Sequence, residues 1–305
     1  MARASAKVIL LGEHAVVYGA PALAAALDRG VTAFATRAPA DRLRIGERLH
    51  TAGDDSELVR ALAALRASLD VPPLAVDAEL EMPAGAGLGA SAALGVAIAR
   101  AALEAIAPDL ELALPANRAR VLAAAAAWEL VFHGNPSGID AAASESGGCI
   151  RYSRETGSTP VPLARPLPLA IAVAGPPAST REMVESVARM SARRPDLVKK
   201  TVNGITALVE NARLCIEAGD APGLGKLMDL NQMLLSGLMV STEGIERACA
   251  TARRVGALGA KLTGAGGGGC VIALADLDPE PILAAWRAEG LECFAATVGG
   301  TERAA

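Results

Sequence analysis

Two glycine-rich segments are candidates for holding a phosphate. The first, residues 83–91, reads PAGAGLGAS and precedes an alanine-rich stretch. Glycines let successive backbone N–H groups point at one anion, and the N-terminus of a following helix adds its dipole. The segment is neither a Walker A loop nor a G-x-G-x-x-G fingerprint. It predicts a phosphate cradle made of backbone, although a tight strand-to-helix turn would use the same residue types.

The second segment, residues 261–269, reads KLTGAGGGG, with five glycines in the six positions from 264 to 269. Ordering so many glycines costs considerable conformational entropy. An apolar run follows at once with no polar spacer, which argues against a flexible linker. The segment therefore predicts a loop whose backbone closely approaches another loop or a ligand.

Three ionisable side chains accompany these segments. Lys7 precedes an apolar run, Glu129 lies near a predicted helix end, and Asp140 follows a helix start predicted at Asn135 and Pro136. Taken alone, each could be an ordinary strand-end lysine or helix-surface acid. Phosphoryl transfer to an alcohol needs phosphate donors, metal ligands, a base and a cation. Because only a turn separates Glu129 from Asp140, these acids could converge on one such site.

The elements that position these groups follow from apolar spacing. Strands are predicted over residues 8–11, 15–18, 30–36, 74–80, 149–152, 169–174, 270–275 and 292–298, and helices over 56–69, 90–106, 115–132, 180–194, 196–218, 222–239, 243–256 and 279–289. Prolines cluster between residues 160 and 168. We therefore expect an α+β protein with two domains, residues 1–165 and 166–305.

Composition excludes several classes of protein. The chain has 305 residues, is 52% hydrophobic but only 2% aromatic, and carries a net charge of −4. Such a core must depend on close helix and sheet contact, and no broad basic field exists for nucleic acid or an anionic membrane. The uncharged run 82–99 contains a proline and several glycines, so we expect no membrane span. Five scattered cysteines without C-x-x-C indicate reduced thiols and a cytoplasmic location.

The segments together resemble the GHMP small-molecule kinases. Three motifs carry the resemblance in the family's order: KVILLGEHAVVYG at residues 7–19, PAGAGLGASAA at 83–93 and KLTGAGGGGC at 261–270. Within the family, the pattern is most similar to the mevalonate kinases, because HGNPSGID at 133–140 and PASTR at 177–181 also match. The family implies a mixed α/β N-terminal domain and a ferredoxin-like C-terminal domain.

The resemblance implies a role for each matching position. Asp140 would be the base or positioner for the hydroxyl, with Lys7 beside it, and Ser91 and Glu129 would bind Mg²⁺. The residues that would wrap the phosphates of ATP are Pro83, Gly85, Ala86, Gly87, Leu88, Gly89, Ala90 and Ser91. Those that would bind the substrate are Glu13, His14, Thr180, Gly264 and Ala265.

The implied reaction is ATP-dependent phosphorylation of the primary 5-hydroxyl of mevalonate, in a possible homodimer. Alternatives are a phosphomevalonate kinase, a mevalonate 3-kinase, a mevalonate diphosphate decarboxylase or a binding protein without catalysis. One residue departs from the family's usual G-L-G-S-S-A, because Ala90 replaces the first serine. The lost hydroxyl removes one potential hydrogen bond to phosphate, so we expect modestly weaker ATP binding.

Overall fold

The computed structural model describes residues 1–54, 56–82, 87–133 and 137–299. Packing divides the chain into two compact units that interleave along the sequence. Unit 1 comprises Met1–Lys7, Arg29–Ala84 and Gly89–Gly147, and unit 2 comprises Val8–Asp28, Gly85–Leu88 and Gly148–Ala305. The predicted domains, residues 1–165 and 166–305, are each one continuous segment, whereas the two units are each made of several segments. The domain boundary at residue 165 therefore stays a prediction.

Strands and helices follow one another in short runs along the described part of the chain. The strands are β1 (Ala2–Leu11), β2 (Ala22–Arg37), β3 (Arg42–Ile45), β4 (Arg48–Thr51), β5 (Leu74–Leu80), β6 (Cys149–Ser153), β7 (Gly157–Val161), β8 (Leu167–Gly175), β9 (Gly259–Leu262), β10 (Gly269–Leu274) and β11 (Cys293–Val298). The helices are the 3₁₀ turn η1 (Ala15–Tyr18), α1 (Glu57–Leu69), α2 (Ala90–Ile106), α3 (Pro115–His133), α4 (Ile139–Ser146), α5 (Thr180–Arg193), α6 (Pro195–Ala218), α7 (Ala221–Gly237), α8 (Glu243–Arg254) and α9 (Glu280–Ala288).

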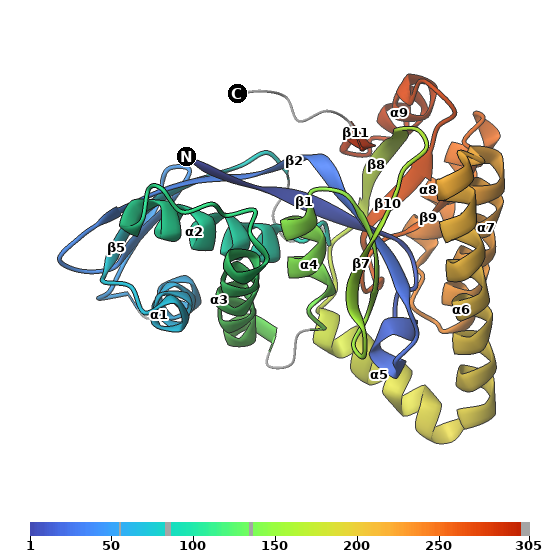
Figure 1. Cartoon of the computed structure of the whole chain (residues 1–305). Coiled ribbons are helices and arrows are strands. Elements are labelled where there is room, and N and C mark those ends of the chain that lie inside the picture. The colour runs from blue at the N-terminus through green and yellow to red at the C-terminus, as the bar shows by residue number, and fades with distance from the viewer. Residues whose placement is uncertain (55, 83–86, 134–136, 300–305) are drawn as a thin grey trace. The chain divides into compact units, whose positions relative to one another are not determined.

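In unit 1, helices pack on a sheet whose strand order is β4-β3-β5-β2. Helices α1 and α2 contact β3 and β5, and α3 packs against both helices (Figure 1). Helix α1 buries Leu62, Leu65 and Leu69, as its apolar spacing predicts. Gly95 of α2 leaves room for the indole of Trp128 on α3, since a Cβ at Gly95 would lie 2.8 Å from that ring. This contact sets α3 close to the start of α2.

Unit 2 contains an antiparallel sheet in the order β11-β8-β10-β9. Helices α5 to α8 connect β8 to β9, and α9 connects β10 to β11. Helices α8 and α9 both contact β8, and α7 packs on β9. This β-α-β-β-α-β sequence, with several helices in the first connection, is the predicted ferredoxin-like arrangement, and the α+β class is confirmed.

Most predicted elements agree with the structure to within a few residues, but two predictions near the N-terminus are wrong. Residues 15–18 form the 3₁₀ turn η1 and not a strand. The extended chain ends at Leu11 because Gly12 and His14 adopt φ angles of 108° and 58°, which are left-handed. Lys7 lies inside β1 and not before a strand. The predicted helix start at Asn135 and Pro136 lies outside the described residues, and α4 has Gly138 as its N-cap.

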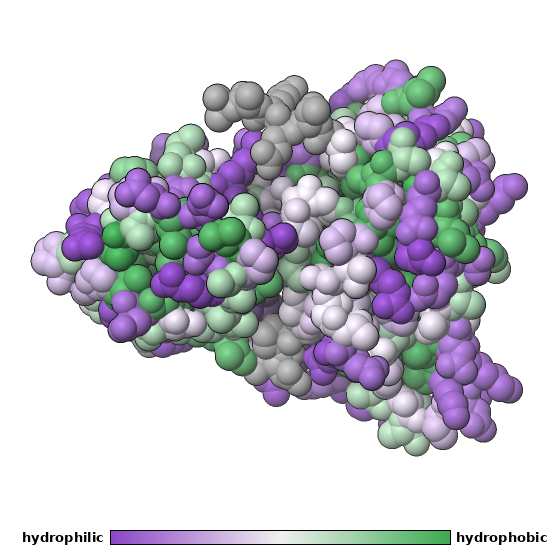
Figure 2. Space-filling view, in the orientation of Figure 1, coloured by the Kyte–Doolittle hydropathy of each residue, from purple (hydrophilic) through white to green (hydrophobic). Residues whose placement is uncertain are grey.

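Within the described ranges, no helix is both long enough and apolar enough to cross a membrane. Figure 2 shows hydrophilic and hydrophobic residues intermixed on the visible face. Some large apolar side chains of unit 2 are exposed, among them Leu214 and Met233.

Helix α7 approaches strand β9 at backbone distance. A Cβ on Gly225 would lie 2.2 Å from the carbonyl oxygen of Leu258, and a Cβ on Gly259 would lie 2.0 Å from that of Gly225. Real Cβ contacts are much longer, so neither position has room for a side chain. This packing is the close helix-to-sheet contact expected from a core that is poor in aromatic residues.

We predict that Gly225→Ala destabilises the protein, because the methyl group forces α7 away from β9. Overpacking of this kind lowers the free energy of unfolding by about 1–3 kcal/mol. Gly237→Ala, at the other end of α7, is the matched control, because a Cβ there has nothing within 4 Å. Denaturant unfolding followed by circular dichroism measures both. Equal effects of the two substitutions would contradict the packing argument.

Candidate active site

A buried lysine and a carboxylate form the central pair of unit 1. Lys7 of β1 is only 2% exposed, and its Nζ lies 3.0 Å from Oδ1 of Asp140, in the first turn of α4. The Asp140 side chain is 36% exposed, so a ligand can reach it. The stem of Lys7 packs on Gly89, where a Cβ would lie 2.7 Å from Lys7 Cγ. The structure therefore brings together two residues that lie far apart in the sequence.

The predicted metal ligands form a second pair. Ser91, in the first turn of α2, donates a hydrogen bond to Oε1 of Glu129 on α3 at 2.5 Å. Trp128 Nε1 donates to the same serine oxygen at 3.3 Å. His133, one turn beyond Glu129, places Nε2 3.9 Å from its other carboxylate oxygen. A hydroxyl oxygen and a carboxylate oxygen are thus adjacent and held in place.

The environment of Glu129 suits a cation. Its carboxylate is 5% exposed, and burial raises its pKa. The neighbouring Asp140 carboxylate raises this pKa further, whereas the hydrogen bond from Ser91 opposes the rise. No group of three or more His, Cys, Asp or Glu side chains suited to a metal occurs in the described part of the chain. Ser91 and Glu129 fit Mg²⁺, which binds through one or two carboxylates together with phosphate oxygens of a substrate.

The first glycine-rich segment ends at a helix N-terminus, as predicted. Gly89 is the N-cap of α2 with a φ of 71°, and Ala90 begins the helix. No side chain caps this end of α2, so its N–H groups and dipole can attract an anion. Gly87 and Leu88 are described, but Pro83, Gly85 and Ala86 lie outside the described residues.

In unit 2, Glu13 is part of a buried ion pair. It follows β1, is fully buried and accepts a hydrogen bond from Lys261 of β9. Asn231 of α7 donates to its second oxygen at 3.2 Å. Burial raises the pKa of Glu13, whereas Lys261 acts in the opposite direction. The structure therefore pairs Glu13 with residues of unit 2, and its predicted contact with a substrate stays a prediction.

His14 is buried next to Glu13. Its Nε2 lies 2.8 Å from the carbonyl oxygen of Ala265, and donating to that oxygen leaves Nδ1 as an acceptor. Burial lowers the pKa of His14, although the bond to Ala265 opposes this effect. The histidine is therefore neutral near pH 7 and offers a hydrogen bond and not a charge. Ala265 binds the histidine through its backbone.

The second glycine-rich segment lies close to the backbone of other segments of the chain, as predicted. A Cβ on Gly264 would lie 3.4 Å from the carbonyl oxygen of Gly87, so the two glycine-rich segments touch within unit 2. Gly266 to Gly269 all have positive φ. Cβ atoms on Gly266 and Gly268 would lie 2.2 Å and 1.9 Å from carbonyl oxygens of Val240 and Pro176. Both the φ angles and the contacts require glycine.

Thr180 begins helix α5 and is exposed, with Ser179 as the N-cap. The sequence patterns did not identify Trp128, Lys261 or Asn231 as functional. Lys261 is the first residue of the third motif, but its partner Glu13 lies 248 residues away in the sequence. Lys261 was predicted to lie in a loop, whereas the structure places it in the short buried strand β9, so no local pattern indicated a buried charge there.

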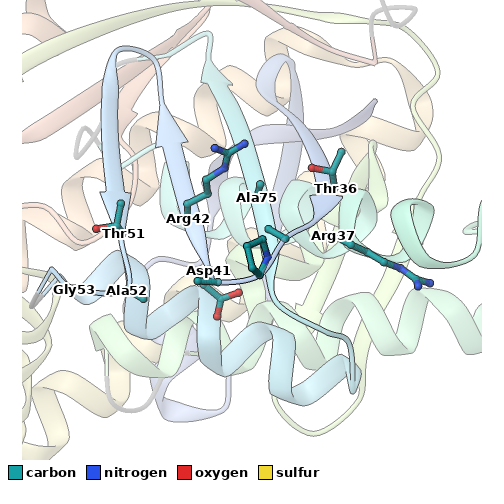
Figure 3. A pocket seen from close by; sticks show the side chains of 11 residues that line it. Thr36, Arg37, Asp41, Arg42, Thr51, Ala52, Gly53 and Ala75 are labelled. Carbon is teal, nitrogen blue, oxygen red and sulfur yellow. The ribbon is translucent and has the colours of Figure 1, made fainter.

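A groove of about 560 Å³ lies elsewhere in unit 1, beside β3 and β4 (Figure 3). None of the predicted site residues lines it. Figure 3 shows Arg37 and Arg42 pointing in different directions. Asp41 accepts hydrogen bonds from Arg66 Nε at 3.1 Å and from the Leu74 N–H at 2.9 Å, so its carboxylate has a structural role. The charged side chains that line the groove therefore do not point toward a common ligand position.

Phosphoryl transfer uses a cation, a carboxylate, metal ligands and phosphate-binding backbone, and unit 1 supplies candidates for each of them. Comparisons with known proteins agree with this chemistry. Residues 56–148 match the family model "GHMP kinases N terminal domain", and residues 209–292 match "GHMP kinases C terminal". The chain belongs to the GHMP kinase family and is an enzyme.

Individual relatives were also found. A mevalonate kinase of Thermococcus gammatolerans is 34% identical over 90% of this chain and 89% of its own length. A mevalonate kinase of Methanothermobacter thermautotrophicus is 35% identical, with 89% of each chain covered. The crystal structure of L. major mevalonate kinase in complex with R-mevalonate superposes with a TM-score of 0.86 at 30% identity, covering 98% of this chain and 95% of that one.

We predict that Lys261→Met strongly destabilises the protein, because it leaves the Glu13 carboxylate buried without its cation. Breaking a buried pair on one side lowers the free energy of unfolding by about 3–5 kcal/mol. Adding Glu13→Gln to Lys261→Met removes the unpaired charge and restores most of the loss. Arg287→Met, in the half-exposed pair of Arg287 and Glu280, is the control and has little effect. An unchanged unfolding midpoint for Lys261→Met would refute this account.

Proposed function

We propose that this kinase transfers the γ-phosphoryl group of ATP to the primary 5-hydroxyl of mevalonate, giving 5-phosphomevalonate and ADP. The observation that carries the proposal is the Lys7–Asp140 pair in a chain whose relatives are mevalonate kinases. One of those relatives was crystallised with R-mevalonate. Assembly into a homodimer stays a prediction.

The Lys7–Asp140 pair accounts for the chemical step. Asp140 accepts the hydroxyl proton as the substrate oxygen bonds to the γ-phosphorus, while the bond from that phosphorus to the leaving oxygen of ADP breaks. Lys7 fixes the carboxylate through the 3.0 Å contact and offsets negative charge near the transferring group. Because Lys7 is buried and packed on Gly89, it holds this position without reorganisation.

Ser91 and Glu129 are the proposed Mg²⁺ ligands. When bound, the metal neutralises phosphate charge and aligns the phosphates. The start of α2, from Gly89 to Ser91, presents backbone N–H groups to the phosphates, and Gly87 and Leu88 precede it. Pro83, Gly85 and Ala86 are further proposed phosphate-binding residues. Ala90 provides only its backbone there.

The proposed substrate contacts involve unit 2. His14 offers a neutral imidazole nitrogen to an oxygen of mevalonate, and Thr180 presents an exposed hydroxyl. Gly264 and Ala265 contribute backbone. Glu13 is also proposed as a substrate-binding residue, and its buried pair with Lys261 fixes the end of β1 next to His14.

The experiment that tests this function measures ADP release with Mg-ATP and mevalonate beside phosphomevalonate, homoserine and galactose. Phosphorus NMR of the product distinguishes phosphorylation of the 5-hydroxyl from that of the 3-hydroxyl. We expect mevalonate-dependent ADP release and a primary phosphate ester. Activity on another alcohol alone would keep the kinase class but refute the substrate, and no activity on any of the four would favour the decarboxylase alternative.

We predict that Asp140→Asn nearly abolishes turnover and leaves ATP binding largely intact, because the amide keeps a hydrogen bond but cannot accept the proton. Loss of a general base lowers kcat by about 100–10,000-fold. Asp77→Asn, in an exposed ion pair with Arg44 in the same unit, is the control. Steady-state kinetics and ATP titration measure both variants. Near-normal turnover of Asp140→Asn would remove Asp140 from the mechanism.

A further inference from the structure

Arg100, in the middle of α2, joins the two elements that carry the Lys7–Asp140 pair. Its Nη1 donates to the carbonyl oxygen of Arg3 at 2.6 Å, on the strand that carries Lys7. Its Nη2 donates at 2.8 Å to the carbonyl oxygen of Glu145, on the helix that carries Asp140. One planar guanidinium therefore connects β1 to α4 away from the reactive pair.

The side chain of Glu145 strengthens this connection. It is 5% exposed, and its Oε1 accepts a hydrogen bond from Arg100 Nη2 at 3.3 Å. Arg118 of α3 binds both of its oxygens, with Nη2 2.6 Å from Oε2 and Nε 2.9 Å from Oε1. Two arginines from different helices thus fix one buried carboxylate near the C-terminal end of α4. Such fork-shaped contacts restrict direction as well as distance.

The cluster of Arg100, Arg118 and Glu145 is better suited to fixing the direction of α4 than to raising the free energy of unfolding. Burying charged groups costs desolvation energy, and apolar replacements of a buried ion pair are often neutral. Helix α4 spans only Ile139–Ser146, and a helix this short does not form without tertiary contacts. Its direction must therefore come from such contacts. Asp140 lies five residues before Glu145, or about 7.5 Å along the helix.

A small tilt of α4 about its fixed end would move Asp140 away from Lys7. A tilt of about 8° over that length shifts Asp140 by about 1 Å. A misplacement of about 1 Å in a reacting group can cost about 100-fold in rate. We infer that Arg100 and Glu145 are positioning residues, which hold β1 and α4 so that Lys7 and Asp140 stay in contact. This inference rests on the proposed role of that pair in phosphoryl transfer.

The test compares Arg100→Met with Arg66→Met. Arg66 lies in the same unit and also joins a carboxylate to a carbonyl, those of Asp41 and Val71, and neither of these two partners lies on β1 or α4. Its side chain is 27% exposed, against 23% for Arg100. We expect similar losses of thermal stability from both variants. Arg100→Met alone should lower kcat, by about 10–100-fold, with KM for ATP and mevalonate nearly unchanged.

Two further measurements distinguish positioning from general damage. In the Asp140→Asn background, Arg100→Met should cause little additional loss of kcat, because the two substitutions act on the same group. Arg100→Lys and Glu145→Gln should give intermediate kcat values, and they replace Arg100→Met if it fails to fold. An unchanged kcat in these variants, or an equal loss in Arg66→Met, would overturn the inference.

A crystal structure of Arg100→Met or Arg100→Lys provides a readout that needs no activity. We expect the Lys7–Asp140 contact, 3.0 Å in the unaltered protein, to be lengthened or lost. An unchanged contact would overturn the inference even if mevalonate proved to be the true substrate. Failure of the unaltered enzyme to phosphorylate mevalonate would instead refute the proposed function, and the structural readout would still decide this inference.

Discussion

A lysine buried inside a β-strand constrains much of unit 1. Lys7 is only 2% exposed, and a buried ammonium group requires a carboxylate nearby. Asp140 supplies it, so α4 must place its first turn against β1. Gly89 must lack a side chain, because the lysine stem fills that space. The start of α2, the direction of α4 and the Arg100–Glu145 contacts all follow from accommodating this one charge.

A second buried charge organises the end of β1 in unit 2. Lys261 compensates Glu13, while Thr263 Oγ1 accepts a hydrogen bond from the Ile9 N–H at 2.9 Å. The third family motif therefore supports the first by direct contact. The glycines that follow have a different cause, since positive φ angles and backbone neighbours exclude any side chain. Charge pairing and close backbone packing together account for the residue types of the third motif in this chain.

Local patterns predicted local structure well. Leu74–Leu80 and Ala90–Ile106 have the predicted bounds, because alternation in the strand and the glycines before the helix are encoded within each segment. The turn at Ala15–Tyr18 was mistaken for a strand, since its apolar composition does not reveal the left-handed angle at His14. The Glu13–Lys261 pair was beyond local reasoning, because tertiary packing alone brings these residues together. Convergence of Lys7 with Asp140 was inferred from family resemblance and not from spacing.

The contact between Trp128 and Ser91 has a spectroscopic consequence. The chain contains two tryptophans, and both are fully buried. Trp128 donates its indole N–H to the serine at the start of α2, whereas Trp286 donates to the Ala248 carbonyl in the core of unit 2. The intrinsic fluorescence therefore has two sources. Trp128 lies beside the residues proposed to bind the metal and the phosphates, whereas Trp286 bonds to a residue with no proposed role in binding. Replacing Trp286 with phenylalanine would leave an enzyme that carries its own single-tryptophan probe of nucleotide binding.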